Sequence, residues 1–257
     1  MMSARIVSLV NQKGGVGKTT TAVSLATALG RRNQRVLLVD LDPQANATSA
    51  TGVDSTDRDG IYEALLEETP AADCIVTVPE EGIDLIPASS SLAGAEVELV
   101  PVLARERRLA AALDPLRDAY DWIFIDCPPS LGLLTINALT ACDAVVIPVQ
   151  CEYMALEGLS RLLKTLDLVR KSLNPKLEIL GVVLTMFDAR TRLAQQVVDE
   201  VRGHFPQAFA TLVPRAVRLS EAPSYGQSIF RYEPGGRGAT AYEALAGELL
   251  ERVEVPA

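Results

Sequence analysis

Histidine and cysteine are scarce in this sequence, and their scarcity limits the chemistry that it can support. The single histidine, His204, cannot form a Ser/His/Asp triad with any second histidine and is better interpreted as structural. The four cysteines are Cys74, Cys127, Cys142 and Cys151, and no two of them form a C-x-x-C pair. We therefore expect reduced thiols that pack as small buried hydrophobic groups.

Long apolar runs are also missing. No stretch approaches the roughly 20 apolar residues that span a bilayer, and residues 1–8 lack the apolar core of a secretory signal. We therefore expect a cytoplasmic protein that does not associate with the membrane. The 48% of hydrophobic and 22% of charged residues suffice to bury a large core, and 257 residues fit one α/β domain over residues 1–257.

Positive charge is in deficit, but the deficit is uneven along the chain. The formal net charge is −9, which argues against a protein coated by nucleic acid. Residues 186–237 nevertheless hold seven arginines and five acids, a local charge of +2, so the rest of the chain carries −11. The arginines are Arg190, Arg192, Arg202, Arg215, Arg218, Arg231 and Arg237. A local basic face is therefore compatible with an acidic protein.

Apolar runs of strand type alternate with stretches of helical periodicity. We expect strands at 5–10, 35–39, 122–125, 144–149 and 177–185, and helices at 19–32, 133–141, 155–173, 194–204 and 242–253. Residues 41–59 are interpreted as a loop, and 61–117 as helical stretches with a hairpin-like strand at 83–86. The pattern predicts an α/β fold, doubly wound, with a mostly parallel sheet and helices on both faces. In such folds the site lies at the carboxyl ends of the strands.

A glycine-rich loop joins the first expected strand to the first expected helix. It reads Lys13, Gly14, Gly15, Val16, Gly17, Lys18, Thr19 and Thr20. Glycines let backbone N–H groups turn toward a polyphosphate, Lys18 adds a point charge, and the Thr19 hydroxyl can bind Mg²⁺. The general P-loop pattern requires a glycine where this sequence has Gln12. The strand and helix around the loop nevertheless favour a phosphate loop over an accidental glycine-rich turn.

Aspartates follow two of the expected strands. Asp40 and Asp42 end the second strand, and Asp126 ends the apolar run 122–125, the position of a Walker B aspartate. Carboxylates at strand ends beside a phosphate loop can hold Mg²⁺ through water or orient an attacking water. Each aspartate alone could instead cap a helix or a turn.

These residues resemble the deviant Walker A ATPases of the ParA/MinD group, whose signature K-G-G-x-G-K-S/T adds the lysine found here at Lys13. The resemblance covers nearly the whole chain, and the matching segments look like those of the chromosomal ParA/Soj branch. The matching segments are V-D-L-D-P-Q at 39–44, N-A-T at 46–48, I-D-C-P-P-S at 125–130, P-V-Q at 148–150, T-M-F-D-A-R-T at 185–191 and P-R-A-V-R-L-S-E-A-P at 214–223.

The resemblance implies an ATPase that is weak alone and stimulated by a partner, with ATP and Mg²⁺ as ligands. Two monomers would close face to face around ATP, each Lys13 reaching the partner's nucleotide. Thr19 would bind Mg²⁺ directly, Asp40 and Asp126 would bind it through water, and Asp42 would orient the attacking water. The residues from Lys13 to Thr20 would bind phosphate, and Pro214 with the backbone near Ala216 would lie against adenine. Many relatives have asparagine where this chain has Ala216, so selectivity for the base is in doubt.

The resemblance also implies non-specific binding to double-stranded DNA on the nucleoid and a ParB/Spo0J-like partner. Arg190 and Arg218 match positions used for DNA, and Arg215 is a further candidate. For Arg215, as for the other arginines of 186–237, a solvated surface charge is the alternative. The cargo could be a chromosome or a plasmid.

Three other functions remain open from the sequence. A MinD-like membrane ATPase needs a basic amphipathic tail, whereas the end of this chain is acidic. An iron–sulfur ATPase would need cluster cysteines, and Cys127 and Cys151 stand in no recognisable cluster motif. A binding module without turnover would have no use for Asp42.

Overall fold

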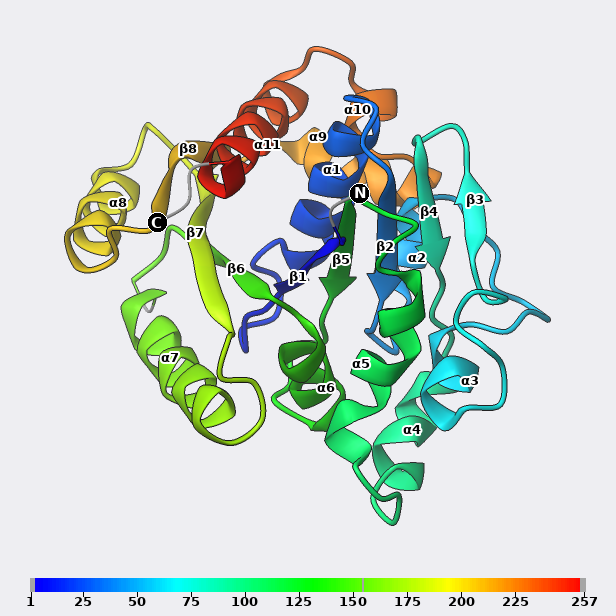
Figure 1. Cartoon of the computed structure of the whole chain (residues 1–257). Coiled ribbons are helices and arrows are strands. Elements are labelled where there is room, and N and C mark those ends of the chain that lie inside the picture. Colours follow the sequence, from blue (N-terminus) through cyan, green and yellow to red (C-terminus); the bar gives the residue numbers. More distant parts are fainter. Residues whose placement is uncertain (1–2, 154, 255–257) are drawn as a thin grey trace.

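The computed structural model describes residues 3–153 and 155–254, which build one eight-stranded sheet in the order β3-β4-β2-β5-β1-β6-β7-β8 (Figure 1). The strands are β1 (Arg5–Leu9), β2 (Val36–Asp40), β3 (Val76–Val78), β4 (Ile83–Ile86), β5 (Trp122–Asp126), β6 (Ala144–Gln150), β7 (Glu178–Phe187) and β8 (Ala208–Pro214). Only the pairing of β3 with β4 is antiparallel among these eight strands. The expected mostly parallel α/β sheet is confirmed.

Helices cover both faces of this sheet. One face is packed by α3 (Ile61–Leu66), α4 (Leu92–Glu98), α5 (Arg108–Leu113), α6 (Leu133–Ala141), α7 (Ala155–Ser172) and α8 (Arg192–His204). The other is packed by α1 (Lys18–Gly30), α2 (Asn46–Ala50), α10 (Ile229–Tyr232) and α11 (Arg237–Glu254). Figure 1 shows α1 and α11 on one side of the sheet and α5, α6 and α7 on the other. The short α9 (Val217–Glu221) lies at the surface and has no buried residue.

Alternation along the strands produces these two cores. In β5, Ile123 and Ile125 belong to the core under α6, whereas Trp122 and Phe124 belong to the core under α1. Successive side chains of a strand point to opposite faces, so a strand covered on both faces must be apolar throughout. The near-continuous apolar runs in the sequence have this cause.

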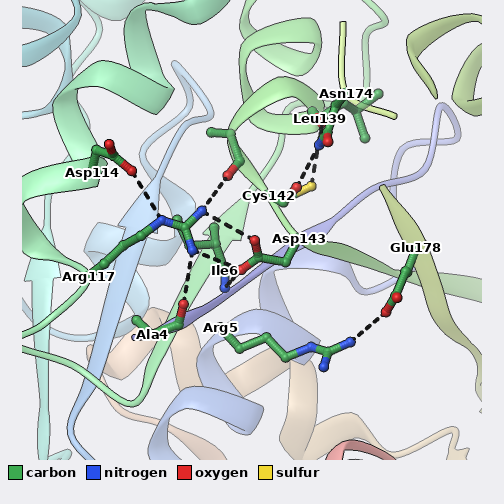
Figure 2. Close-up of polar contacts among 11 residues, drawn as sticks. Ala4, Arg5, Ile6, Asp114, Arg117, Leu139, Cys142, Asp143, Asn174 and Glu178 are labelled. Atoms are coloured by element: carbon green, nitrogen blue, oxygen red, sulfur yellow. Dashed lines mark hydrogen bonds and ion pairs between the residues drawn. The ribbon is translucent and has the colours of Figure 1, made fainter. Parts of the chain in front are cut away.

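A cluster of polar contacts fastens the amino-terminal edge of the sheet (Figure 2). The Arg117 guanidinium donates to the carbonyl of Ala4 at 3.1 Å and forms an ion pair with Asp143, which also accepts from the backbone N–H of Ile6. Beside it, Arg5 at the start of β1 pairs with Glu178 at the start of β7 at 2.8 Å. These contacts tie β1, β6 and β7 together at the edge opposite the phosphate loop.

Several expected elements differ from the structure. The segment 41–59, interpreted as a loop, contains the one-turn helix α2, which begins at Asn46 because Asp40 holds its backbone at Thr48. The last helix begins at Arg237 rather than Tyr242. Strand β8 and helices α9 and α10 were not predicted, because β8 is only partly buried and the two helices have five and four residues. The hairpin-like strand at 83–86 is confirmed, with β3 as its partner.

None of the helices in the described ranges is long and apolar enough to cross a membrane. The four cysteines are free thiols and all are buried, as expected.

Candidate nucleotide site

The glycine-rich loop leaves the carboxyl end of β1 and feeds directly into α1. Gly15 and Gly17 have φ values of 73° and 86°, a left-handed conformation that favours glycine over any residue with a side chain. Two side chains fix the loop from neighbouring strand ends. Asn11 donates to the carbonyl of Pro148 at 2.7 Å and accepts from the N–H of Lys13, and Thr185 donates to the carbonyl of Val16 at 2.8 Å. The loop is thus held at both ends while Gly14 and Gly15 remain exposed.

The two lysines of the loop have different surroundings. Lys18 is 7% exposed, and burial lowers the pKa of its ammonium, although Asp126 and Asp42 oppose this effect by favouring the charged form. The side chain of Lys13 is 47% exposed, and its ammonium forms a 2.8 Å ion pair with Glu152. Lys18 therefore serves the interior of the loop, whereas Lys13 is available at the surface.

Asp40 and Asp126 lie side by side, because they are register partners at the ends of β2 and β5. The carboxylate of Asp40 accepts bonds of 2.8 Å from both the N–H and the hydroxyl of Thr48. Burial raises the pKa of Asp40 to about 6, and the hydrogen bonds from Thr48 and from the backbone N–H of Asp42 oppose this rise. Asp42, 7% exposed, accepts from the N–H of Gln44 at 3.0 Å, which leaves its second oxygen available.

Asp126 is the residue that most clearly requires a ligand. It is fully buried, and neither of its carboxylate oxygens has a hydrogen-bond partner among the described residues. Burial and then the neighbouring Asp40 raise the pKa of Asp126 well above its ordinary value, while Thr19 and Lys18 oppose the shift. A buried carboxylate without a partner is costly, and a cation with its water shell would remove that cost. Hard oxygen donors at Thr19, Asp40 and Asp126 fit Mg²⁺.

A cleft of about 330 Å³ opens beside the loop. Gly17 and Thr20 line it beside the loop, Thr185 and Met186 line it from β7, and the end of β8 and the residues after it line it with Pro214 and Ala216. Tyr242 of α11 closes it from below, with its hydroxyl bonded to that of Thr21 at 3.0 Å. The two residues predicted to lie against a base therefore do line a cleft that continues from the phosphate loop.

The three candidate DNA-binding arginines are exposed on connections that follow β7 and β8. Arg190 pairs with Asp188 at 2.7 Å, and Arg218 of α9 pairs with Glu221 at 2.8 Å. Arg215 lines the cleft, and its backbone N–H donates to Phe187. Arg215 therefore lines the base cleft and also acts electrostatically on Asp188, the partner of Arg190.

Sequence reasoning missed residues that act on the site through others. Asn11 and Thr185 position the loop, and Thr48 positions Asp40. Met186, at the end of β7 beside the cleft, has a φ of 52°, which is unusual for a residue with a side chain. Signals for Thr48 and Thr185 existed, since both lie in the segments that carry the family resemblance, but neither has a charge that marks it.

A phosphate loop between the first strand and helix, with strand-end aspartates beside it, defines a P-loop nucleotide-binding protein. Residues 4–179 match the family model described as AAA domain. The chain belongs to the ParA/Soj family of chromosome-partitioning ATPases, as the relatives described next show.

The relatives are similar over almost their whole length. The sporulation initiation inhibitor protein Soj of Bacillus subtilis is 56% identical over 95% of this chain and 98% of its own. The chromosome partitioning protein ParA of Myxococcus xanthus is 54% identical over 96% of this chain and 88% of its own. The chromosome-partitioning ATPase Soj of Thermus thermophilus is 50% identical, with 99% of each chain covered.

Solved structures support the fold. A protein named cobyrinic acid a,c-diamide synthase from Mycobacterium smegmatis, solved with ADP and magnesium, has a TM-score of 0.86 and 37% identity over 98% of this chain and 96% of its own. The same protein was also solved with an ATP analogue and magnesium. McdA of Cyanothece in complex with ATP has a TM-score of 0.87 at 22% identity, over 100% of this chain and 99% of its own, and supports the fold alone.

Proposed function

We propose that residues 1–257 act as one ATPase domain that dimerises on ATP, binds DNA without sequence preference and is released when a partner stimulates hydrolysis. The observation that carries the proposal is the contrast within the loop. Lys18 is buried beside Asp126, whereas Lys13, five residues earlier, is half exposed. A second lysine outside the loop's own interior is what a nucleotide shared between two copies requires.

The residues from Lys13 to Thr20 bind the phosphates of ATP. The loop's backbone N–H groups and the α1 N-terminus favour negative charge, and Lys18 adds a buried cation. Pro214 and Ala216 bind the base in the adjoining cleft. Relatives solved with ADP, an ATP analogue and magnesium support this choice of ligand.

Thr19, Asp40 and Asp126 hold Mg²⁺, the last two through water. When bound, Mg²⁺ neutralises phosphate charge and so favours transfer of the terminal phosphoryl group. Thr48 keeps Asp40 ionised and oriented by donating two hydrogen bonds to it. Asp42 orients the attacking water through the carboxylate oxygen that Gln44 does not occupy.

Lys13 makes dimerisation conditional on ATP. In one copy its charge is balanced by Glu152. A partner's triphosphate offers more negative charge than one carboxylate, so the lysine exchanges Glu152 for that phosphate when two copies meet. ADP lacks the terminal phosphate and supports the exchange less well.

DNA binds the surface that carries Arg190, Arg215 and Arg218, and pairing two copies doubles it. Phosphate contacts alone require no base sequence and give a steep dependence on salt. A ParB/Spo0J-like centromere-binding partner stimulates hydrolysis, and the protein acts in the cytoplasm on the nucleoid. The relatives named for chromosome partitioning support this function.

The names of the relatives weigh against a synthase role. The protein named as a synthase is 37% identical to this chain, whereas the Myxococcus xanthus ParA, which is named for chromosome partitioning, is 54% identical. A MinD-like membrane role lacks support in α11, whose last turns carry Glu248 and Glu251, carboxylates that anionic lipids would repel. The tail residues 255–257 lie outside the described residues.

The proposal is tested by measuring ATP hydrolysis and dimer formation in the same variants. Asp42→Ala should keep ATP-dependent dimers and DNA binding while phosphate release falls at least tenfold, because only the water-orienting group is lost. Asp42→Asn is the conservative companion, and light scattering with and without ATP reports the dimer. Normal turnover by Asp42→Ala would remove this residue from the mechanism, and loss of the dimer would place it in assembly instead.

A further inference from the structure

Both candidate DNA-binding arginines that form ion pairs are already occupied by carboxylates of their own neighbourhood. Arg190 donates from Nε to Oδ1 of Asp188 at 2.9 Å and from Nη2 to Oδ2 at 2.7 Å, so both carboxylate oxygens are engaged by one guanidinium. This fork-to-fork geometry is also the geometry in which arginine binds phosphate. The donors of Arg190 that suit a DNA phosphate are therefore the ones that Asp188 uses.

Asp188 is held in place and keeps its charge. Its side chain is 20% exposed, whereas that of Arg190 is 87% exposed, and Oδ1 also accepts from the backbone N–H of Arg190 at 3.1 Å. The bonds from Arg190, with a smaller contribution from Arg215, hold the pKa of Asp188 far below its ordinary range. A phosphate that approaches Arg190 therefore meets a fixed negative charge.

Arg218 on α9 is also paired with an acid, through one nitrogen of its guanidinium. Its guanidinium lies 2.8 Å from Glu221 and 3.8 Å from Glu233, and the hydroxyl of Tyr232 donates to Glu221 at 3.0 Å. The side chain of Arg218 is 55% exposed, so DNA can reach it, but the same carboxylate stands beside it. Two arginines of the surface are thus matched by three acids.

We propose that Asp188 and Glu221 are competing ligands of the DNA-binding arginines, which weaken the hold of a single protomer on DNA so that binding requires the paired surface. The inference rests on the proposed DNA-binding function. It assigns a role to the acids of the surface, which set the affinity threshold, whereas the arginines supply the attraction.

The proposed competition predicts a change in how the DNA affinity depends on salt concentration. A neutral Arg190–Asp188 pair brings no net charge to a phosphate, so its contact releases few counterions. Asp188→Asn removes the carboxylate that pairs with the Arg190 guanidinium. The amide oxygen of the asparagine can still accept from the backbone N–H of Arg190. Each such contact should then steepen the slope of log affinity against log salt by about 0.9, or about 2 for the dimer.

The experiment measures binding of the full chain to a fluorescent duplex of random sequence, with ATP and without nucleotide, from 50 to 300 mM salt. Asp188→Asn and Glu221→Gln should each bind about tenfold more tightly at 100 mM salt, since two pairs per dimer each contribute up to about fivefold. The double variant should bind DNA without nucleotide, where the wild type does not.

Glu178→Gln is the matched control. Glu178 begins β7, the strand that Asp188 follows, and pairs with Arg5 at 2.8 Å (Figure 2). Glu178→Gln therefore makes the same change in net charge about 30 Å from Asp188. It should change the affinity less than twofold. Asp188→Asn in an Arg190→Gln background should gain little, because the competing ligand then has nothing to occupy.

This inference alone would be overturned if Asp188→Asn left the DNA affinity and its salt slope unchanged. The wild type would in that case still bind DNA with ATP, and Arg190→Gln would still weaken that binding. An equal gain in the Arg190→Gln background would also overturn it, since the acid would then act by general repulsion. Wild type that ignores DNA with ATP at every salt concentration would instead contradict the proposed function.

Discussion

At the scale of single residues, burial decides what each charged group of the site does. Lys18 and Asp126 are buried next to one another, so each favours the charged form of the other against a low-dielectric surrounding. Lys13 has the same chemistry as Lys18 but lies where water and a second molecule can reach it. The sequence alone shows two lysines in one loop, and only the fold separates their roles.

Replacing each lysine by alanine should separate binding from assembly. Lys18→Ala should lose nucleotide binding by at least a hundredfold, because no other lysine or arginine is buried among residues 3–153 and 155–253. Lys13→Ala should bind nucleotide within a few-fold of wild type yet remain monomeric with ATP. Titration of a fluorescent ATP analogue and light scattering measure the two effects, and an ATP dimer of Lys13→Ala would refute the role of this lysine between subunits.

The raised pKa of Asp40 predicts a dependence of stability on pH in protein free of metal and nucleotide. The folded-state pKa of about 6 lies above the ordinary 3.8, so the folded protein binds this proton more tightly than the unfolded chain. The stabilisation that this bound proton gives is present below about pH 4 and is lost as the pH rises through about 6. The free energy of unfolding changes by about 3 kcal/mol over this range.

Denaturant unfolding in EDTA at pH 5 and pH 8 measures this change. Asp40→Asn, which cannot ionise, should gain stability relative to wild type at pH 8 and keep only about half of that advantage at pH 5. The exposed Asp199→Asn serves as the control and should show no such shift. A constant difference between wild type and Asp40→Asn across this range would contradict the assignment of the buried charge.

At the scale of elements, α2 links the metal-side aspartates to the segment that carries Arg218. Thr48 of α2 holds Asp40, and Gly52, two residues after the helix, packs backbone to backbone against Gly226. A Cβ on Gly226 would lie 2.8 Å from Cα of Gly52, and Gly226 has a φ of 60°. Neither backbone can move away without shifting α2 or the turn before α10.

Gly226→Ala should therefore destabilise the protein by about 1–3 kcal/mol, through the strained φ and the contact with Gly52. The matched control is Gly203→Ala in α8, where a Cβ meets no atom within 4 Å and alanine is the better helix former. Urea unfolding should show a loss for the first variant and none for the second. Equal midpoints would show that the Gly52–Gly226 contact is loose in solution.

Helices and strands could be predicted from the sequence where the hydrophobic periodicity was strong, but not where tertiary contacts stabilise them. Helix α6 was expected at its observed bounds, and the central strands to within two residues, because apolar runs identify them. Helix α2 forms on five residues that Asp40 organises from another strand end, and no local pattern reveals this. The position of Thr185 against Val16 likewise depends on distant chain segments meeting in space.

At the scale of the whole molecule, charge is distributed so that the acidic chain can still meet DNA. The net charge is −9, and the excess of arginine is confined to 186–237. In the fold these arginines reach the surface on connections after β7 and β8, whereas the Arg117 and Asp143 cluster fastens the opposite edge of the sheet. Under the proposed function, one protomer would offer a small basic area to DNA, and pairing two protomers would enlarge it.

Sedimentation of the wild-type protein with random-sequence DNA, compared between ATP and ADP at several salt concentrations, tests this central claim most directly. We predict binding with ATP that weakens steeply as salt rises, and little binding with ADP or with Lys13→Ala. Binding of the same strength with ADP, or with the Lys13→Ala protein, would contradict an ATP-gated dimer as the DNA-binding species.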